Sequence, residues 1–291
     1  MSYYQEEDGG SLKAQLKWRK KCLSKLSKEE YGFVAQKSVF SHYFLGIRTF
    51  VFYFSTLYLL ANYHKNPFIW IPAGFFQGQW LVNLIFLNHE CIHQLVFNKR
   101  DSRLKIAIET WSGRIYCVLP MIGSTYFRAY HSMHHHQFFQ GTDDPKSTHF
   151  VPKDNSRKTR IKYWGPGLGA IFNGIQASVS SKLSKDIQRT HFWEKLVNKS
   201  FHLGVILYFN WSFGFSFWMK VHAIPHFFWF PVAFMINRCG QHYCCNPKES
   251  ALQSTNCIGN WFWDLCHLYS EYHVEHHTFA EVQKRFLNRF N

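Results

Sequence analysis

Acidic side chains are scarce in this sequence: 18 Asp and Glu stand against 33 Lys and Arg, a formal net charge of +15 over 291 residues. No internal repeat or low-complexity tract is present, and 46% of the residues are hydrophobic, which excludes a disordered tail or a fibrous repeat. We see no charged-then-apolar signal peptide, so we expect the eight cysteines to be reduced thiols. No C-x2-C pair is present either, which disfavours a zinc site built from the C-terminal cysteines.

Aromatic residues are abundant, with 30 Phe, 15 Tyr and 11 Trp. A strong positive charge can indicate nucleic-acid binding, but here the apolar residues gather into long runs rather than being dispersed as in a soluble core. We therefore expect a membrane protein with no nucleic-acid partner.

Four apolar stretches each have roughly the 17–25 residues that a bilayer crossing needs: 44–62, 68–87, 201–219 and 221–238. Short turns around 64–66 and 220–222 join them in pairs. The predicted fold class is an all-α membrane protein with four transmembrane helices in two hairpins; four buried helices of a soluble protein are the alternative. Polar residues inside the stretches should face the bundle interior; they are Arg48, Gln77, Gln79, Asn83 and Asn210.

Basic residues fall on one side of this arrangement. Residues 1–40 carry eight Lys and Arg and residues 137–199 carry eleven, whereas each hairpin turn has one. By the positive-inside bias, both termini and the central loop are cytosolic. We divide the chain into a basic cytosolic tail (1–40), partly helical at best, and a multi-pass membrane domain (41–291).

The moderately apolar segment 104–124 contains Glu109 and Arg114, and we expect it to lie in the membrane interface without crossing. The reason is the position of histidine clusters on either side of it. Only about 37 residues separate them, too few for two crossings and a turn.

The chain contains 18 histidines, and many fall in clusters. The first cluster is His89-Glu90-Cys91-Ile92-His93. On a helix, residues i and i+4 share a face, so His89 and His93 can bind one metal ion. The pattern also matches the H-E-x-x-H motif of zinc peptidases, in which the Glu is the general base.

Two further clusters share the pattern H-x-x-H-H: His131-Ser132-Met133-His134-His135 and His273-Val274-Glu275-His276-His277. The repeated spacing places three imidazoles on one helical face each time. Eight imidazoles exceed what a single tetrahedral zinc ion binds, so two metal ions are indicated. Imidazole suits iron, zinc and copper alike, and the ligand type does not choose among them. We expect these clusters to form a cytosolic, histidine-rich helical cap.

These boxes, placed between two hydrophobic hairpins, resemble the membrane-bound fatty acid desaturase superfamily over roughly residues 40–285. The surrounding sequence is also similar to the family: Phe127-Arg128, Gly141-Thr142-Asp143-Asp144-Pro145, Gln241-His242 and Asn260-Trp261-Phe262-Trp263. In that family a ninth histidine follows the fourth span, and His242 matches it.

The resemblance implies two iron ions, O2 as co-substrate, and electrons from an external donor such as a ferredoxin or cytochrome b5. The substrate would be a lipid acyl chain, and the outcome a C=C bond. Each ligand histidine should donate its second N–H to an acceptor, for which the nearest candidates are Glu90, Asp143, Asp144 and Glu275. The membrane would be the endoplasmic reticulum in a eukaryote or the inner membrane in a bacterium.

Three alternatives remain open from the sequence. A hydroxylase or ketolase acting on a lipid or isoprenoid would use the same scaffold, a zinc membrane peptidase would use only His89, Glu90 and His93, and a non-enzymatic sensor or scaffold would need no metal chemistry. His136 and His267 adjoin boxes and are weaker ligand candidates. The single histidines are expected to be ordinary surface or packing residues: His42, His64, His149, His191, His202, His222 and His226.

Overall fold

The computed structural model describes residues 12–99, 101–132, 156–158, 161, 183–242, 256, 259–268, 270, 272–279 and 282–283. This part of the chain is mostly helical and contains no strand. The elements are α1 (Leu12–Leu23), α2 (Lys28–Val34), α3 (Val39–Tyr63), α4 (Pro67–Ile92), α5 (Arg103–Val118), α6 (Ser124–Ser132), α10 (Lys185–Phe213), α11 (Phe215–Trp218), the π-helical segments η2 (Met219–Ala223) and η3 (Pro225–Trp229), α12 (Phe230–His242), α13 (Trp261–His267) and α14 (His273–Thr278).

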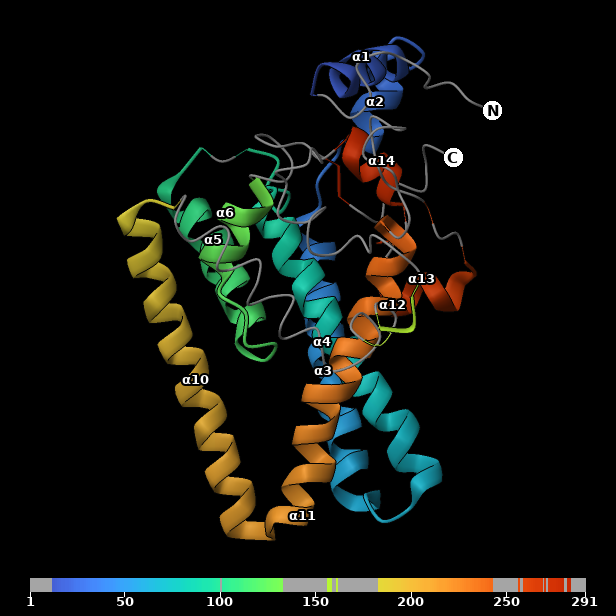
Figure 1. The fold of residues 1–291 in the computed structure, drawn as a ribbon. Helices are drawn as coiled ribbons and strands as arrows, with labels where there is room; N and C mark the ends of the chain where they lie inside the picture. The colour runs from blue at the N-terminus through green and yellow to red at the C-terminus, as the bar shows by residue number, and fades with distance from the viewer. Residues whose placement is uncertain are drawn as a thin grey trace.

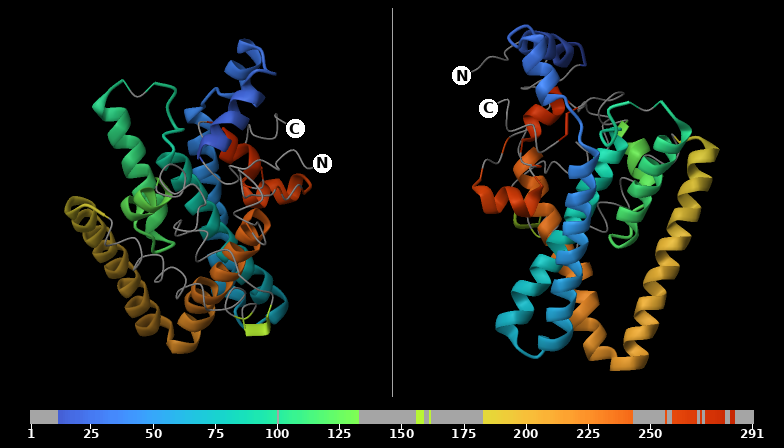
Figure 2. Two further views of the ribbon diagram at one scale, coloured as in Figure 1. Left: turned by 45° about the horizontal axis from the view of Figure 1, so that its top comes forward. Right: turned by 180° about the vertical axis from the view of Figure 1, so that it is seen from behind.

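The long helices form two hairpins (Figure 1). Helix α3 runs antiparallel to α4, and α10 is followed by a return helix made of α11, η2, η3 and α12. Both turns lie at one end of the molecule, whereas α1 and α14 lie at the other end in every view (Figures 1 and 2). This arrangement brings the C-terminal end of α4 close to α6 and α14.

Among the described residues, two helices are long and apolar enough to cross a membrane: Val39–Tyr63, with an 18-residue stretch of mean hydropathy 1.5, and Phe215–Asn237, with a stretch of mean hydropathy 1.2. The first contains the first predicted span, and the second contains all but the last residue of the fourth. Helix α4 contains the second predicted span, and every residue from Gln77 to Ile92 is buried. It packs against α3, α5, α12 and η3, so it forms the centre of the fold.

The second hairpin turns earlier than the sequence predicted. Lys220, Val221 and His222 lie inside η2, and the chain turns at Gly214, whose φ is +86°. Its N–H donates to the carbonyl of Asn210 (3.0 Å) and closes the last turn of α10. A left-handed backbone of this kind is easily adopted only by glycine, which explains why the turn is at this residue. Pro225 lacks an N–H and begins η3, in agreement with a wider helical turn there.

Polar residues in the predicted second span face the interior, as expected. Gln77, Gln79 and Asn83 are each at most 2% exposed. The amide nitrogen of Gln79 donates to Asn83 Oδ1 (3.2 Å) and to the carbonyl of Cys266 (2.9 Å), which joins α4 to α13. In α3, Arg48 Nη2 donates to the neighbouring carbonyl of Leu265 (3.1 Å). Buried hydrogen bonds therefore connect the first hairpin to the C-terminal region.

The segment after the first histidine box forms α5, which at 16 residues is about 24 Å long and too short to cross a bilayer. Two helices, α1 and α2, lie within the part of the predicted tail that the structure describes. Helix α2 begins with a capping box between Ser27 and Glu30. Tyr31 and Leu23 pack against Tyr272, Phe279 and Val282, so α1 and α2 are docked next to α14.

Candidate metal centre

Three helices bring predicted ligand histidines together. Helix α4 carries His89 near its C-terminal end, and His93 is its C-cap residue. The N–H of His93 donates to the carbonyl of His89 (3.1 Å), so the first box keeps helical spacing and its two imidazoles share a face. Helix α6 supplies His131 and α14 supplies His276.

One ligand nitrogen from each of His89, His93, His131 and His276 lies within 4.8 Å of the other three. The rings of His89 and His131 have centroids 4.4 Å apart, and those of His89 and His276 are 4.7 Å apart. Four imidazoles from three separate segments thus surround one small volume, which is the donor set and number that a transition metal takes.

The closest contact in this cluster is between His93 Nε2 and His131 Nε2, at 2.8 Å. Two N–H groups cannot point at each other at this distance, so at least one of the two nitrogens presents a lone pair. His89, His131 and His276 are each at most 2% exposed. Metal ions bind the neutral form of imidazole through such a lone pair.

The remaining histidines of the third box form a second pair. His273 Nε2 and His277 Nε2 are 3.1 Å apart, and both residues are about 1% exposed. Their rings lie 5.5 Å (His273) and 5.8 Å (His277) from the ring of His276. Helix α14 therefore presents His276 to the cluster of four and the other two histidines to a neighbouring position.

Other predicted site residues are not described. His134, His135, His136, Asp143 and Asp144 lie outside the described residues. His242 ends α12 and Glu275 lies in α14, but their side chains are also outside the described part.

Glu90 is the one predicted acceptor whose side chain is described. Within the described chain, the hydrogen-bond partner of its carboxylate is His42 of α3, with Oε2 2.8 Å from Nδ1. His42 is 1% exposed, and its Nε2 is 3.7 Å from the sulfur of Cys91. The sequence placed His42 among the packing histidines, because nothing near it in the chain signals a partner 48 residues away. This pair joins α3 to the first box.

His267 lies apart from the cluster of four. Its Nδ1 bonds to the carbonyl of Trp263 (3.0 Å), and its ring lies 4.0 Å from the Trp263 ring. Burial lowers the pKa of His267 to about 4, so the ring is neutral at pH 7 and its Nδ1–H is the donor.

The arrangement of these boxes can be compared with known proteins. The family model described as fatty acid desaturase matches residues 65–285, about three quarters of the chain, and this region contains all three boxes. A search of curated proteins finds no significant match. Because one model covers most of the chain and all of its histidine boxes, the chain belongs to the fatty acid desaturase family, as the boxes predicted.

Proposed function

We propose that this chain is an O2-dependent di-iron oxidoreductase that introduces a C=C bond into a fatty acyl chain within a membrane. The observation that carries the proposal is the convergence of His89, His93, His131 and His276 within 4.8 Å, in a chain of the desaturase family. Family membership favours iron over the other metals that imidazole binds.

The proposed ligands are the eight box histidines together with a ninth, His242; the box residues are His89, His93, His131, His134, His135, His273, His276 and His277. The cluster of four would hold one iron, and the neighbouring His273 and His277 would belong to the second. Bound iron would use O2 and two external electrons to remove hydrogen from an unactivated C–H bond. The buried His89, His131, His273, His276 and His277 would limit access of water to the metal ions.

Acids near the boxes would orient the ligands. We propose Asp143, Asp144 and Glu275 as acceptors of imidazole N–H groups, because ligand histidines commonly donate their second N–H in this way. Glu90, the residue after His89, would hold the first box against α3 through its bond to His42.

We further propose that the two hairpins cross the membrane four times, with the termini and the boxes in the cytosol. The position of both turns at the end opposite α1 and α14 supports this topology (Figure 1). Leu203, Leu207 and Trp211 on the second half of α10 are each more than half exposed, as expected for a face in contact with lipid. The membrane would be the endoplasmic reticulum in a eukaryotic host and the inner membrane in a bacterium.

The electrons would come from a separate ferredoxin or cytochrome b5. The chain carries a net charge of +15, and acidic carrier proteins are attracted to a basic surface. Activity of the purified protein should therefore depend on an added donor and its reductase.

The peptidase alternative is disfavoured by two observations. Glu90, which would serve as general base, is hydrogen-bonded to buried His42. His131 and His276 also enter the cluster with the two H-E-x-x-H histidines, and a peptidase that used only this motif would not need them.

The deciding experiment compares lipids from cells that express wild type, His276→Ala or His64→Ala, each with an electron donor and its reductase. His64 lies at the hairpin turn, far from α14, and serves as the matched control (Figure 1). We expect a product lighter by two hydrogens with wild type and His64→Ala but not with His276→Ala. Purified wild type should contain about two iron ions per chain, and His276→Ala fewer.

Other outcomes would redirect the proposal. A product that has gained oxygen identifies a hydroxylase or ketolase with the same metal ligands. Bound zinc without iron, together with a lipid profile identical in all three strains, contradicts a di-iron enzyme.

A further inference from the structure

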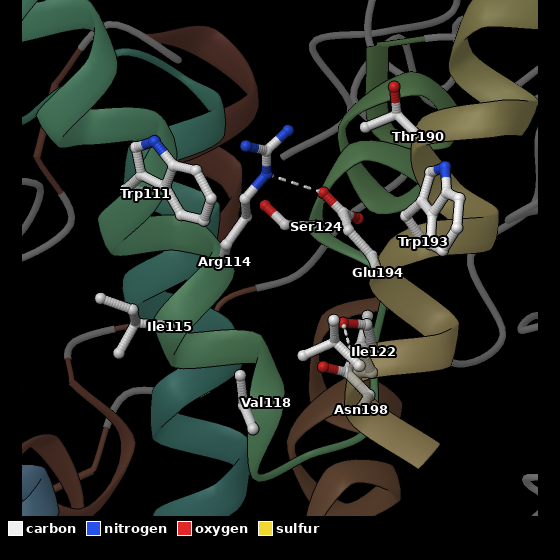
Figure 3. Close-up of a pocket in the computed structure, with 11 residues that line it drawn as sticks. Trp111, Arg114, Ile115, Val118, Ile122, Ser124, Thr190, Trp193, Glu194 and Asn198 are labelled. Atoms are coloured by element: carbon white, nitrogen blue, oxygen red, sulfur yellow. Dashed lines mark hydrogen bonds and ion pairs between the residues drawn. The ribbon is translucent and has the colours of Figure 1, made fainter. Parts of the chain in front are cut away.

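A cavity of about 300 Å3 lies between α5, the start of α6 and the N-terminal half of α10 (Figure 3). Its lower part is apolar and is lined by Ile115, Val118 and Ile122. None of the nine predicted ligand histidines appears among its described lining residues. Ser124 lies in the wall, and its hydroxyl donates to Asn88 Oδ1 (2.8 Å), one residue before the first box. The cavity is therefore next to the histidine cluster without being part of it.

The positively charged side chain of Arg114 lies at the upper part of this cavity. Arg114 Nε donates to Glu194 Oε1 (3.0 Å), and the guanidinium carbon lies 4.7 Å from the centroid of the Trp111 ring. Glu194 also accepts hydrogen bonds from the N–H (2.9 Å) and the hydroxyl (2.6 Å) of Thr125. The Glu194 carboxylate therefore accepts three hydrogen bonds. The guanidinium of Arg114 is held in one orientation by Glu194 and by the Trp111 ring.

The outer nitrogens of Arg114 remain available. No described residue accepts a hydrogen bond from its two terminal nitrogens, and they point away from the apolar part of the cavity in Figure 3. The side chain is 27% exposed. A guanidinium fork of this kind matches two oxygens of a phosphate or carboxylate group.

The cavity opens between the outer faces of α5 and α10. Four lining residues are each more than half exposed on the outer faces of α5 and α10: Trp111, Ile115, Trp193 and Val197. Trp111 and Trp193 stand at the level of Arg114, above the apolar lining (Figure 3). Tryptophan concentrates where lipid headgroups meet the hydrocarbon, so this level corresponds to the headgroup region and the apolar part to the acyl chains.

We infer that this cavity binds one anionic phospholipid, with its phosphate on the terminal nitrogens of Arg114 and an acyl chain between α5 and α10. A lateral opening at headgroup level admits a lipid from the surrounding leaflet, in which phospholipids are the main source of phosphate. The bound lipid would fill the space between α10 and α5 and stabilise their packing. The inference is independent of the proposed iron chemistry.

The test measures lipid retention by native mass spectrometry of the full-length protein in detergent, after delipidation and incubation with one lipid at a time. The lipids are phosphatidylglycerol, diacylglycerol, which lacks the phosphate, and oleate, which offers a carboxylate. The main variant is Arg114→Gln/Glu194→Gln, which removes both charges so that neither is left unpaired. Val118→Phe fills the apolar part, and Arg189→Gln, an exposed arginine of α10 outside the lining, is the control.

We expect wild type and Arg189→Gln to retain phosphatidylglycerol at least about tenfold better than diacylglycerol, from the loss of a charge-assisted hydrogen bond. The double variant should lose this preference, and Val118→Phe should retain less of both lipids. Equal phosphatidylglycerol retention by all four proteins would overturn the site, and preferential, Arg114-dependent retention of oleate would overturn its assignment to phospholipid. Iron content measured on the same samples separates this result from the proposed enzymatic function.

Discussion

His42 and Glu90 are both buried, and their side chains meet at 2.8 Å between α3 and α4. The ring centroids of Tyr43 and Tyr116 lie 5.2 Å and 5.6 Å from that of His42, so the imidazole packs against two aromatic rings. A polar pair inside such an apolar environment is stable only while both partners are present. At the residue scale, the first histidine box therefore depends on a side chain that belongs to no box.

Replacing His42 by Ala should lower the free energy of unfolding by about 1–3 kcal/mol, because the Glu90 carboxyl loses its buried partner. Thermal and chemical unfolding of the purified protein in detergent measures the effect. Glu90→Gln keeps an oxygen that can accept the His42 N–H, so it should cost less than His42→Ala. Equal stability of wild type and His42→Ala would show that this pair does not hold α3 to α4.

Helix α4 is the element on which the others pack, and one contact is unusually close. A Cβ placed on Gly78 would lie 2.5 Å from the backbone nitrogen of Phe230, where η3 meets α12. Backbone atoms cannot move aside as a flexible side chain can. The second hairpin therefore reaches the first only because residue 78 has no side chain.

Gly78→Ala should destabilise the protein by about 1–3 kcal/mol through overpacking. Gly204 is the matched control: it also lies within a long helix, and a Cβ there would meet nothing within 4 Å. Gly204→Ala should therefore leave stability unchanged or raise it slightly, because Ala favours helix. The same unfolding assay compares the two variants, and equal effects would contradict a tight contact at Gly78.

Helix α14 is short, and it is positioned partly by the N-terminal helices. Tyr31 of α2 lies 6.4 Å from Phe279 between ring centroids, and Ser38 N–H donates to Gln283 Oε1 (3.0 Å). The amide of Gln283 in turn donates to the carbonyl of Leu95 (2.9 Å), just after the first box. The segment around residue 38 thus connects the first and third boxes.

Tyr31→Ala should loosen α14 and reduce the iron retained after purification, because His273, His276 and His277 lie on that helix. Phe33 lies on the same α2 helix but is 60% exposed, so Phe33→Ala is the control and should retain iron as wild type does. Iron per chain after dialysis against a mild chelator is the measurement. Similar iron loss from both variants would indicate that α2 contributes only general stability.

At the scale of the whole molecule, the two hairpins share one direction, with both turns at the end opposite α1 and α14 (Figure 2). Helices α4, α6 and α14 contribute to one histidine cluster, toward the end of the molecule opposite the two turns. A single metal site built from all three boxes requires that they lie on one side of the membrane. The shared direction of the two hairpins agrees with the four-span topology that we propose, in which the boxes lie on one side.

Short epitope tags should reveal this topology in intact and permeabilised cells. Tags at the N-terminus and after Asn98 should be reached by antibody under the same condition, because α3 and α4 together return the chain to its starting side. Tags after Asn66 and Gly214 should be reached under the opposite condition. Exposure of the Asn66 and Asn98 tags on the same side would contradict a crossing by α4.

Much of the site could be predicted because its signals are local. Histidine spacing within the first and third boxes acts over a few residues, and a helix converts it directly into a shared face. The interior position of Gln77, Gln79 and Asn83 also followed from the cost of polar groups in an apolar span. The Gly214 turn was missed because the apolar run continues past it, so composition alone placed the turn near Lys220.

The sequence by itself determined the helical class, the histidine boxes and the family, since each depends on residue type and short spacing. Only the tertiary structure decided that His93 Nε2 lies beside His131 Nε2, that His42 is the partner of Glu90, and that α2 packs on the segment carrying Phe279. The two residues of each contact are separated by 38, 48 and about 250 positions in the chain, respectively. Helical periodicity carries no information over such separations, and the packing of whole helices sets which side chains meet.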